Sequence, residues 1–402
     1  MSKKRILVGL SGGIDSSVAA MLLKKQGYQV IGVFLVFTRI KTNKNNTNTN
    51  EHESENIYCN QEALRSARAV CDKLDIPFYV IDVSKEFKRD VIDYFISEYE
   101  AGRTPNPCVV CNRKIKFKWL LKIAEKLNCD KIATGHYARI VCETKDEKPK
   151  TKNTNSKIKK CYLYRAKDKT KDQSYFLWQL EQKQLSKIIF PLGDYTKKQV
   201  RRLAKKYQLP ICIKKESQDI CFIPSADHTD FIRTHAEKLT KPGDIVDICG
   251  SVLGHHQGFL YYTIGQRENL PKLDYSKLSI PINQHRRPAL YVIKLDVGKN
   301  KLVLGLEKDL YSKRINVEKI HWINPDKNRK SFTALAKIRS TAQKEKCKID
   351  IEGKKVIVKF QKPQRAATPG QSIVFYKNEK VLGGGIINIS TDKYTNNTDT
   401  VS

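Results

Sequence analysis

The beginning of the chain runs from an apolar segment through a glycine turn and a helix into a second apolar segment. Residues 3–10 end in an apolar run that predicts a buried parallel strand. Residues 16–26 place apolar side chains at helical spacing, and residues 28–37 predict the next strand. Strand, tight turn, helix and strand in this order form a βαβ unit, which few folds other than an open α/β sheet accommodate.

Strands and helices alternate up to about residue 224, after which the pattern changes. Further strands are predicted at 78–83 and 131–133, and further helices at 60–74 and 115–127. Residues 290–295 and 301–306 flank the turn sequence Val-Gly-Lys-Asn, which is typical of a hairpin. Short strands with glycine or proline turns follow, a spacing typical of a small barrel, at 334–339, 346–351, 356–360, 372–376 and 381–385.

We therefore predict an α/β fold made of a parallel-sheet domain, a small central mixed domain and a C-terminal β-barrel. The predicted domains span residues 1–224, 225–310 and 311–390, with a polar tail at 391–402. Two polar stretches at 41–56 and 143–160 are predicted to be solvated inserts in the first domain, because they lack the apolar side chains of a core.

The net charge favours an acidic partner. The chain has 402 residues, and 75 Lys and Arg against 42 Asp and Glu give a formal charge of +33, part of which lies in the inserts. No apolar stretch of about 18 residues and no secretion signal is found, so we expect a soluble, cytoplasmic protein without a membrane partner. Eleven scattered cysteines in such a chain should mostly be free thiols.

The glycine turn, Ser11 to Ser17, has the composition of a phosphate-binding loop. Backbone N–H groups, hydroxyls and a helix N-terminus converge there on one point. Asp15 would repel a bare phosphate, which suggests that Mg²⁺ bridges the carboxylate and a pyrophosphate. The loop lacks both the ending of a Walker A motif and a G-x-G-x-x-G motif. A glycine turn that serves only the fold is the alternative.

Two cysteine segments carry the second candidate chemistry. Residues 103–112 (RTPNPCVVCN) form a proline-stiffened loop before a helix predicted at 113–127. The helix dipole and the neighbouring Arg113 and Lys114 should shift a thiol there toward its thiolate. Cys221 lies far away in the segment SQDICFIP. Taken alone, each of these cysteines is more often a small buried apolar residue than a catalyst.

Together these motifs resemble a known family. An apolar strand followed by SGGxDS resembles the PP-loop ATP pyrophosphatase superfamily, and the cysteine segments resemble the tRNA-specific 2-thiouridylases within it. Further segments carry the same resemblance: ATGHYAR at 133–139, KDQSYFL at 171–177, GHHQG at 254–258, YTIGQR at 262–267 and TPGQ at 368–371. The resemblance implies a PP-loop, adenine-nucleotide α-hydrolase-like first domain and covers nearly the whole chain apart from the inserts and the tail.

The resemblance also implies roles for individual residues. ATP would be contacted by Gly9, Leu10, Ser11, Gly12, Gly13, Ile14, Asp15, Ser16, Leu35 and Gly135. The target base would lie against Asn106, Pro107 and Cys108, and tRNA would be contacted by His136, Lys171, Asp172, Gln173, Arg339, Ser340 and Gln371. Cys221 would carry a persulfide, and Cys111 would be its partner nucleophile and form a transient disulfide with it.

The implied reaction is ATP-dependent 2-thiolation of the wobble uridine, U34, in the anticodon loop of tRNA. Adenylylation of uracil O2 releases pyrophosphate and turns a poor leaving oxygen into AMP, which a sulfur nucleophile then displaces. A sulfur-donor or sulfur-relay protein is the implied partner, and the central domain would bind tRNA. The chain departs from the family at Cys108, often Asp, which leaves proton transfer open, and at Leu35, often Met.

Cys108 creates a C-x-x-C pair with Cys111, for which three interpretations remain. A zinc knuckle needs a second ligand pair, and a thioredoxin-like pair needs a different surrounding fold. The third is an iron–sulfur cluster on Cys108, Cys111 and Cys221 with one open iron site. The predicted helix at 197–208 raises a similar choice, because its many cations suit either a solvated face or phosphate binding.

Two other functions compete with thiolation. A different PP-loop ligase would adenylylate a small molecule and would not need Cys111 or Cys221. A non-catalytic RNA-binding protein would bind tRNA without releasing pyrophosphate.

Overall fold

A computed structural model of the chain describes residues 3–38, 61–143, 160–211, 220–223, 237–279, 287–326, 330–353 and 355–388. The insert predicted at 41–56, nearly all of the insert at 143–160 and the tail at 391–402 lie outside the described residues. The chain divides into two compact units, which are described separately. The first comprises residues 1–92, 108–222 and 379–382, and the second comprises 93–107, 223–378 and 383–402.

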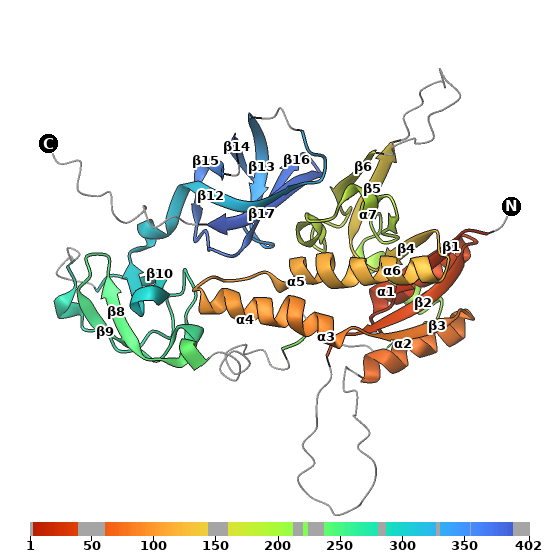
Figure 1. The fold of residues 1–402 in the computed structure, drawn as a ribbon, viewed down its shortest axis with the longest axis horizontal. Helices are drawn as coiled ribbons and strands as arrows, with labels where there is room; N and C mark the ends of the chain where they lie inside the picture. Colours follow the sequence, from red (N-terminus) through yellow and green to blue (C-terminus); the bar gives the residue numbers. More distant parts are fainter. Residues whose placement is uncertain are drawn as a thin grey trace, which may run out of the picture. The chain divides into compact units, whose positions relative to one another are not determined.

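A five-stranded parallel sheet forms the centre of the first unit (Figure 1). Its order is β3-β2-β1-β4-β7, and all four pairings are parallel. The strands are β1 (Arg5–Gly9), β2 (Gln29–Val36), β3 (Phe78–Asp82), β4 (Lys131–Thr134) and β7 (Ile188–Ile189). The predicted α/β class and the first four strands are confirmed. Because β2 and β4 lie on opposite sides of β1, the strand order reverses there, which is where open α/β sheets bind ligands.

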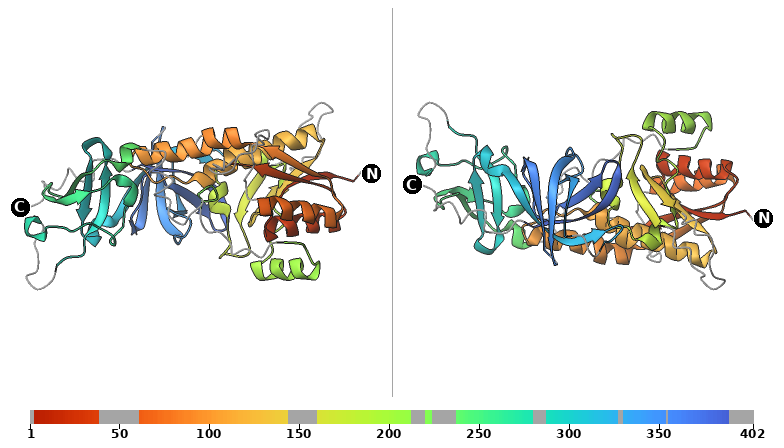
Figure 2. Two further views of the ribbon diagram at one scale, coloured as in Figure 1. Left: turned by 90° about the horizontal axis from the view of Figure 1, so that it is seen from below. Right: turned by 90° about the horizontal axis from the view of Figure 1, so that it is seen from above.

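Helix α1 (Ile14–Lys25) follows the glycine loop directly and is buried on two sides. On one side, Ala20 and Leu23 pack with the sheet and with α2 (Gln61–Leu74). On the other, Val18 and Met21 pack with α8 (Lys197–Lys206), which lies beside α1 in Figure 2. This double burial explains why the sequence of α1 is apolar almost all round, whereas α8 has only a narrow apolar stripe.

The cysteine loop leads into a helix that changes register. A short turn, α5 (Pro107–Val110), is followed by a π-helical segment (Cys111–Lys116) and then by α6 (Phe117–Lys126). The predicted helix at 113–127 is thus confirmed in position, but its first turn is wider than an α-helix. Short π-helical segments of this kind are frequent at functional sites. Earlier in the chain, α3 (Ser84–Phe87) precedes a second π-helical segment (Lys88–Ile92).

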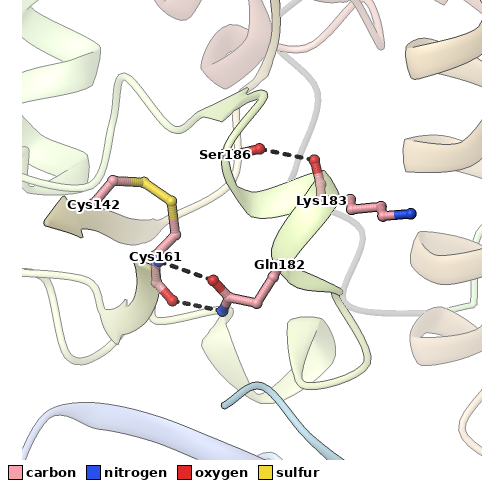
Figure 3. The surroundings of a disulfide bond; sticks show 5 residues. All are labelled: Cys142, Cys161, Gln182, Lys183 and Ser186. Carbon is pink, nitrogen blue, oxygen red and sulfur yellow. Dashed lines mark hydrogen bonds between the residues drawn. A yellow bond between two sulfur atoms is a disulfide. The ribbon is translucent and has the colours of Figure 1, made fainter. Parts of the chain in front are cut away.

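A hairpin of β5 (Ala138–Glu143) and β6 (Lys160–Arg165) completes the first unit. Lys380 and Val381, at the start of β17, pair with β6. Cys142 and Cys161 lie directly opposite each other and form a disulfide (Figure 3). The expectation of free thiols is met at the seven other cysteines that the structure describes, but it is wrong for this pair. Strand pairing brings these two thiols together despite the insert that separates them in sequence.

The amide of Gln182, in α7 (Gln182–Leu185), holds the disulfide-bonded strand at Cys161. Its Oε1 accepts from the Cys161 N–H at 2.9 Å, and its Nε2 donates to the Cys161 carbonyl at 2.7 Å (Figure 3). Cys161 is fully buried, whereas Cys142 is exposed.

The second unit contains a four-stranded mixed sheet and a barrel. The sheet has the order β10-β11-β8-β9, made by β8 (Gly243–Asp247), β9 (Val252–His256), β10 (Tyr291–Asp296) and β11 (Lys301–Gly305). The predicted hairpin is confirmed in β10 and β11, which are antiparallel, while β8 and β11 are parallel. Asn300 closes the hairpin turn with a φ of 50°, a left-handed conformation that asparagine tolerates.

The predicted C-terminal barrel is confirmed. Its strands are β12 (Tyr311–Trp322), β13 (Ser331–Lys337), β14 (Glu345–Glu352), β15 (Lys355–Arg365), β16 (Ser372–Lys377) and β17 (Lys380–Asn388). β12 pairs with both β15 and β17, which closes the barrel. The unit also includes α4 (Asp93–Glu100). Among the helices of the described ranges, none has the length and apolarity needed to cross a bilayer.

Candidate active site

The glycine loop is closed on itself by serine hydroxyls. The Ser11 N–H donates to Ser16 Oγ at 3.1 Å, and Ser16 Oγ donates to the Gly13 carbonyl at 3.1 Å. Ser17 Oγ donates to the same carbonyl at 2.9 Å. Gly13 is the N-cap of α1 and offers no side chain to the first N–H groups of the helix. An anion at this point would meet the helix N-terminus without competition from a capping side chain.

Two glycines allow other segments to approach this loop. Gly12 has a φ of +73°, and a Cβ added there would lie 2.6 Å from the Ala63 Cα in α2. A Cβ on Gly135, which follows β4, would lie 2.6 Å from the Ser16 N. Gly135 therefore lies directly against the loop, as expected if Gly135 and the loop contact the same nucleotide. Leu35 is buried near the carboxyl end of β2, the same edge of the sheet.

Asp15 is held by a cation that sequence reasoning did not single out. Lys197 Nζ lies 2.8 Å from both carboxylate oxygens of Asp15, and Tyr137 Oη donates to Oδ1 at 2.8 Å. The Lys197 side chain is only 9% exposed. Lys197 is the first residue of α8, which begins with a capping box formed by Thr196 and Gln199. The capping box at residues 196–199 was the available signal, but it marks only where α8 begins; the packing of Val200 and Ala204 on α1 decides which lysine points inward.

This ion pair bears on the Mg²⁺ prediction. Both oxygens of Asp15 already accept from an ammonium group, so the structure supplies the positive charge that the sequence argument assigned to a metal. A Mg²⁺ ion on Asp15 would have to share these oxygens with Lys197, and this ligand role stays a prediction.

The segment with Lys171, Asp172 and Gln173 has mostly internal contacts. Asp172 accepts from Arg165 Nε at 2.7 Å, and its side chain is only 3% exposed. Gln173 Oε1 accepts from the Tyr137 N–H at 2.9 Å, which ties this segment to the residue that contacts Asp15. The Asp172 and Gln173 side chains thus have structural partners, whereas Lys171 lines a basic hollow beside α8. Their predicted contacts with tRNA stay predictions.

The three thiols interact with one lysine. Cys108 and Cys221 are exposed and Cys111 is buried, and all three are free. The pKa of Cys111 is raised to about 12, mainly by burial; Lys116 acts to lower it, and Cys221 and Cys108 add smaller raising effects. The same three thiols raise the pKa of Lys116 against the opposite effect of burial. Cys111 and Cys221, far apart in sequence, therefore both lie within electrostatic range of Lys116.

The expectation of a thiolate at the start of the helix is wrong for Cys111 in this structure. Arg113 and Lys114 are exposed to solvent, so they do little to stabilise a thiolate at the buried Cys111. Cys111 is the first residue of the π-helical segment. It is not at the N-terminus of the helix, because the helical stretch already begins with α5 at Pro107. At neutral pH its resting form is the thiol.

The iron–sulfur hypothesis finds no support. Within the part of the chain that the structure describes, no group of three or more His, Cys, Asp or Glu residues is arranged to hold a metal ion. The function proposed below therefore includes no iron–sulfur cluster. The residues Ser217, Gln218 and Asp219 of the second cysteine motif lie outside the described residues.

His136 adjoins the thiol region as a neutral side chain. Its Nδ1 lies 2.8 Å from Thr134 Oγ1, and its ring contacts Phe117 and Phe190 with centroids 5.6 and 5.9 Å away. Burial lowers the pKa of His136 to about 3, with a further contribution from Lys116. A cationic contact between this imidazole and RNA phosphate is thus disfavoured, although a neutral hydrogen bond is not.

In the second unit, Gln371 anchors the loop that carries Asn106 and Pro107. Gln371 Nε2 donates to the carbonyls of Thr104 and Pro105 at 3.1 and 3.3 Å. The Thr104 N–H donates to the Pro369 carbonyl at 2.8 Å. Gln371, predicted to contact tRNA, therefore positions the loop that carries Asn106 and Pro107 in this structure.

Arg339 and Ser340 occupy an exposed bend after β13, where their side chains are open to solvent. Their predicted contact with tRNA is compatible with this exposure and stays a prediction.

Comparison with known proteins places the whole chain in one family. Three family models match in succession: a tRNA methyl transferase HUP domain at residues 4–225, a tRNA methyl transferase PRC-barrel domain at 229–306 and an aminomethyltransferase β-barrel domain at 312–387. The names of the first two models refer to methyl transfer, whereas the curated relatives that match over the full length are named 2-thiouridylases.

One such relative is the tRNA-specific 2-thiouridylase MnmA 2 of Thermoanaerobacter sp. (strain X514), 43% identical over 95% of this chain and 97% of that protein. The tRNA-specific 2-thiouridylase MnmA of Carboxydothermus hydrogenoformans is 42% identical over 96% of this chain and 98% of its own length. The Clostridium perfringens protein of the same name is also 42% identical, over 96% and 99%. The chain belongs to the tRNA-specific 2-thiouridylase family of tRNA sulfurtransferases.

Proposed function

We propose that this protein catalyses ATP-dependent 2-thiolation of uridine at the wobble position, U34, of tRNA. One observation supports the proposal most strongly. Cys111 and Cys221 interact with a common Lys116 in the same unit that carries the glycine loop. Nucleotide activation and sulfur chemistry therefore have candidate residues within one compact body.

The glycine loop would bind the phosphates of ATP. The uncapped N-terminus of α1 and the serine hydroxyls provide donors, and Gly135 leaves room beside the loop. Lys197 neutralises Asp15, so that a carboxylate within the loop does not repel the triphosphate. Uracil O2 would attack the α-phosphorus of ATP. The bond to the β-phosphate breaks, pyrophosphate leaves and an O2-adenylylated uridine forms.

The cysteines would then deliver sulfur. A persulfide on Cys221, loaded by a sulfur-donor or sulfur-relay protein, holds sulfur in a transferable form. Deprotonated Cys111 attacks the Cys221 Sγ, a Cys111–Cys221 disulfide forms and hydrosulfide leaves. The hydrosulfide attacks C2 of the uracil and AMP departs with the O2 oxygen. A dithiol reductant that is oxidised in exchange returns both cysteines to thiols.

The raised pKa of Cys111 means that this attack requires a proton acceptor. The proposal assigns no residue of this chain to the removal of that proton. The ammonium of Lys116 favours the thiolate once it forms, because it lowers the pKa of Cys111.

The predicted domain roles are part of the same proposal. The division at residues 1–224, 225–310 and 311–390 assigns catalysis to the first domain and tRNA binding to the central one. Asn106, Pro107 and Cys108 would lie against the target base, and the exposed Arg339 and Ser340 would contact tRNA from the barrel.

The test compares wild type, Cys221→Ser and Cys249→Ser in a reaction with tRNA, ATP, Mg²⁺ and a persulfide donor. Cys249 is also exposed and free, so its variant is a matched control for the loss of a surface thiol. We expect mass spectrometry of the tRNA nucleosides to find 2-thiouridine with wild type and Cys249→Ser. Cys221→Ser should form less than about 1% as much, because serine cannot hold a persulfide.

The same reaction separates the rival functions. Undiminished 2-thiouridine with Cys221→Ser would refute the role of Cys221. Pyrophosphate release that proceeds without tRNA and without either cysteine would favour a small-molecule ligase. Binding of tRNA with no pyrophosphate release by wild type would favour a non-catalytic RNA-binding protein.

A further inference from the structure

One side of α8 carries cations at a spacing of i, i+3, i+4 and i+7, which places them on a single helix face. This α8 basic face consists of Lys198, Arg201, Arg202 and Lys205. All four residues are exposed, whereas Val200 and Ala204 on the opposite side are buried with α1. The helix therefore has a fixed orientation that turns its cations outward.

The α8 basic face borders a hollow of about 590 Å³, and the described residues that line it are all cations. Lys171 and Lys197 complete its lining. Among the residues that the structure describes, Lys198, Arg202 and Lys205 have no carboxylate partner. Like charges at this spacing repel each other in the free protein, so the cluster does not stabilise the helix. An anionic ligand would remove this repulsion.

The arrangement favours a chain of phosphates over a single nucleotide. The first and last cations of the α8 basic face are seven positions apart in sequence, which corresponds to about 10 Å along a helix. Among the residues that the structure describes, none that lines the hollow has an aromatic ring or an amide side chain that could read a base. Cations without base-reading groups are typical of contacts with the nucleic-acid backbone, which position the substrate without reading its sequence.

We propose that the α8 basic face binds backbone phosphates of the tRNA substrate, an inference that rests on the proposed function. Lys171, which is not part of α8, lines the same hollow and adds a cation to it. Lys197 is the residue at which the two sites meet, because its ammonium is directed to Asp15 rather than to solvent.

The test is the variant Lys198→Gln/Arg202→Gln/Lys205→Gln. Its control is Lys118→Gln/Lys122→Gln/Lys126→Gln, which removes three exposed cations from α6, a helix of the same length. A charge-conserving variant, Lys198→Arg/Arg202→Lys/Lys205→Arg, tests for damage to the helix itself. Dissociation constants for tRNA are measured from 50 to 300 mM KCl, and ATP binding is measured without tRNA.

We expect the α8 triple variant to bind tRNA about 10-fold or more weakly at physiological salt. The slope of log Kd against log salt should fall by about 3, one for each lost phosphate contact. The α6 control and the charge-conserving variant should bind within about 2-fold of wild type, and ATP binding should be unchanged in all of them.

Three results would overturn the inference: wild-type affinity and slope in the α8 triple variant, an equal loss in the α6 control, or weaker ATP binding without tRNA. The last would assign the face to nucleotide phosphates. Failure of the proposed function is distinguishable, because it appears as absence of 2-thiouridine with the wild-type enzyme, whereas failure of this inference leaves wild-type thiolation intact.

Discussion

Lys197 and Asp15 show how one partly buried ion pair can decide the charge of a candidate nucleotide site. Either charged group alone would destabilise the folded protein, since removing one partner leaves an uncompensated charge in a poorly solvated position. Asp15 stays 32% exposed, so water moderates this cost. The pair keeps the glycine loop neutral overall and thereby compatible with a triphosphate.

We predict that Lys197→Met weakens ATP binding about 10-fold, because the freed Asp15 carboxylate repels the phosphates. Lys206→Met is the matched control, since Lys206 lies exposed on the same helix. Calorimetric ATP titration measures the effect. The double variant Asp15→Asn/Lys197→Met should recover part of the lost affinity, because it removes the unpaired charge. If the losses of ATP affinity caused by the two single substitutions simply add in the double variant, the proposed coupling between Asp15 and Lys197 is contradicted.

At this scale the sequence predicted residue types well and their partners poorly. The glycine loop and the two cysteine segments were evident from local motifs. The partner of Asp15 was not, because Lys197 belongs to a helix in which six of ten residues are cations. Only the packing of Val200 and Ala204 on α1 decides which of these cations turns inward. The pKa of Cys111 likewise depends on burial, which its neighbours in sequence do not reveal.

The β5–β6 hairpin is the element whose stability depends most on one bond. The disulfide closes a loop with a sequence separation of 19 residues, and the opposing Cys142 and Cys161 need little backbone movement to form it. A cross-link over a loop of this length stabilises the folded state by about 3 kcal/mol in the chain-entropy account.

We predict that reduction of the disulfide makes the hairpin exchange its amide hydrogens about 100-fold faster, because local opening no longer has to stretch a cross-linked loop. Hydrogen exchange followed by mass spectrometry of β5 and β6 measures this. A Cys142→Ser/Cys161→Ser variant should exchange at the fast rate in both oxidising and reducing buffer. Equal exchange of oxidised and reduced wild type would show that the bond does not stabilise the hairpin.

The elements that sequence predicted best are those with unbroken apolar runs or with alternating apolar and polar residues. β1, β2 and the barrel strands β14 and β16 fall close to their expected positions, since burial on one or both faces leaves a clear pattern. The β5–β6 hairpin was missed because a polar insert separates its strands. The π-helical register at Cys111–Lys116 was missed because one extra residue per turn leaves no periodic signal in so short a segment.

For the whole molecule, the charge of +33 has to be divided between binding and background. The α8 basic face contributes cations that have a fixed orientation and a common hollow. Other cations are neutralised within the fold, such as Arg165 by Asp172 and Arg103 by Glu98. Net charge alone could not make this distinction, which depends on where folding places each cation relative to the acids.

We predict that tRNA affinity falls at least 100-fold between 50 and 200 mM KCl, because each neutralised phosphate releases a counterion. Replacing the six lysines between residues 144 and 159 by glutamine removes charge from a polar insert without touching the α8 basic face. That variant should keep the wild-type salt dependence in a filter-binding titration. If it loses as much of the slope as the α8 triple variant, the charge acts as a general field, and α8 is one contributor among many rather than a docking surface.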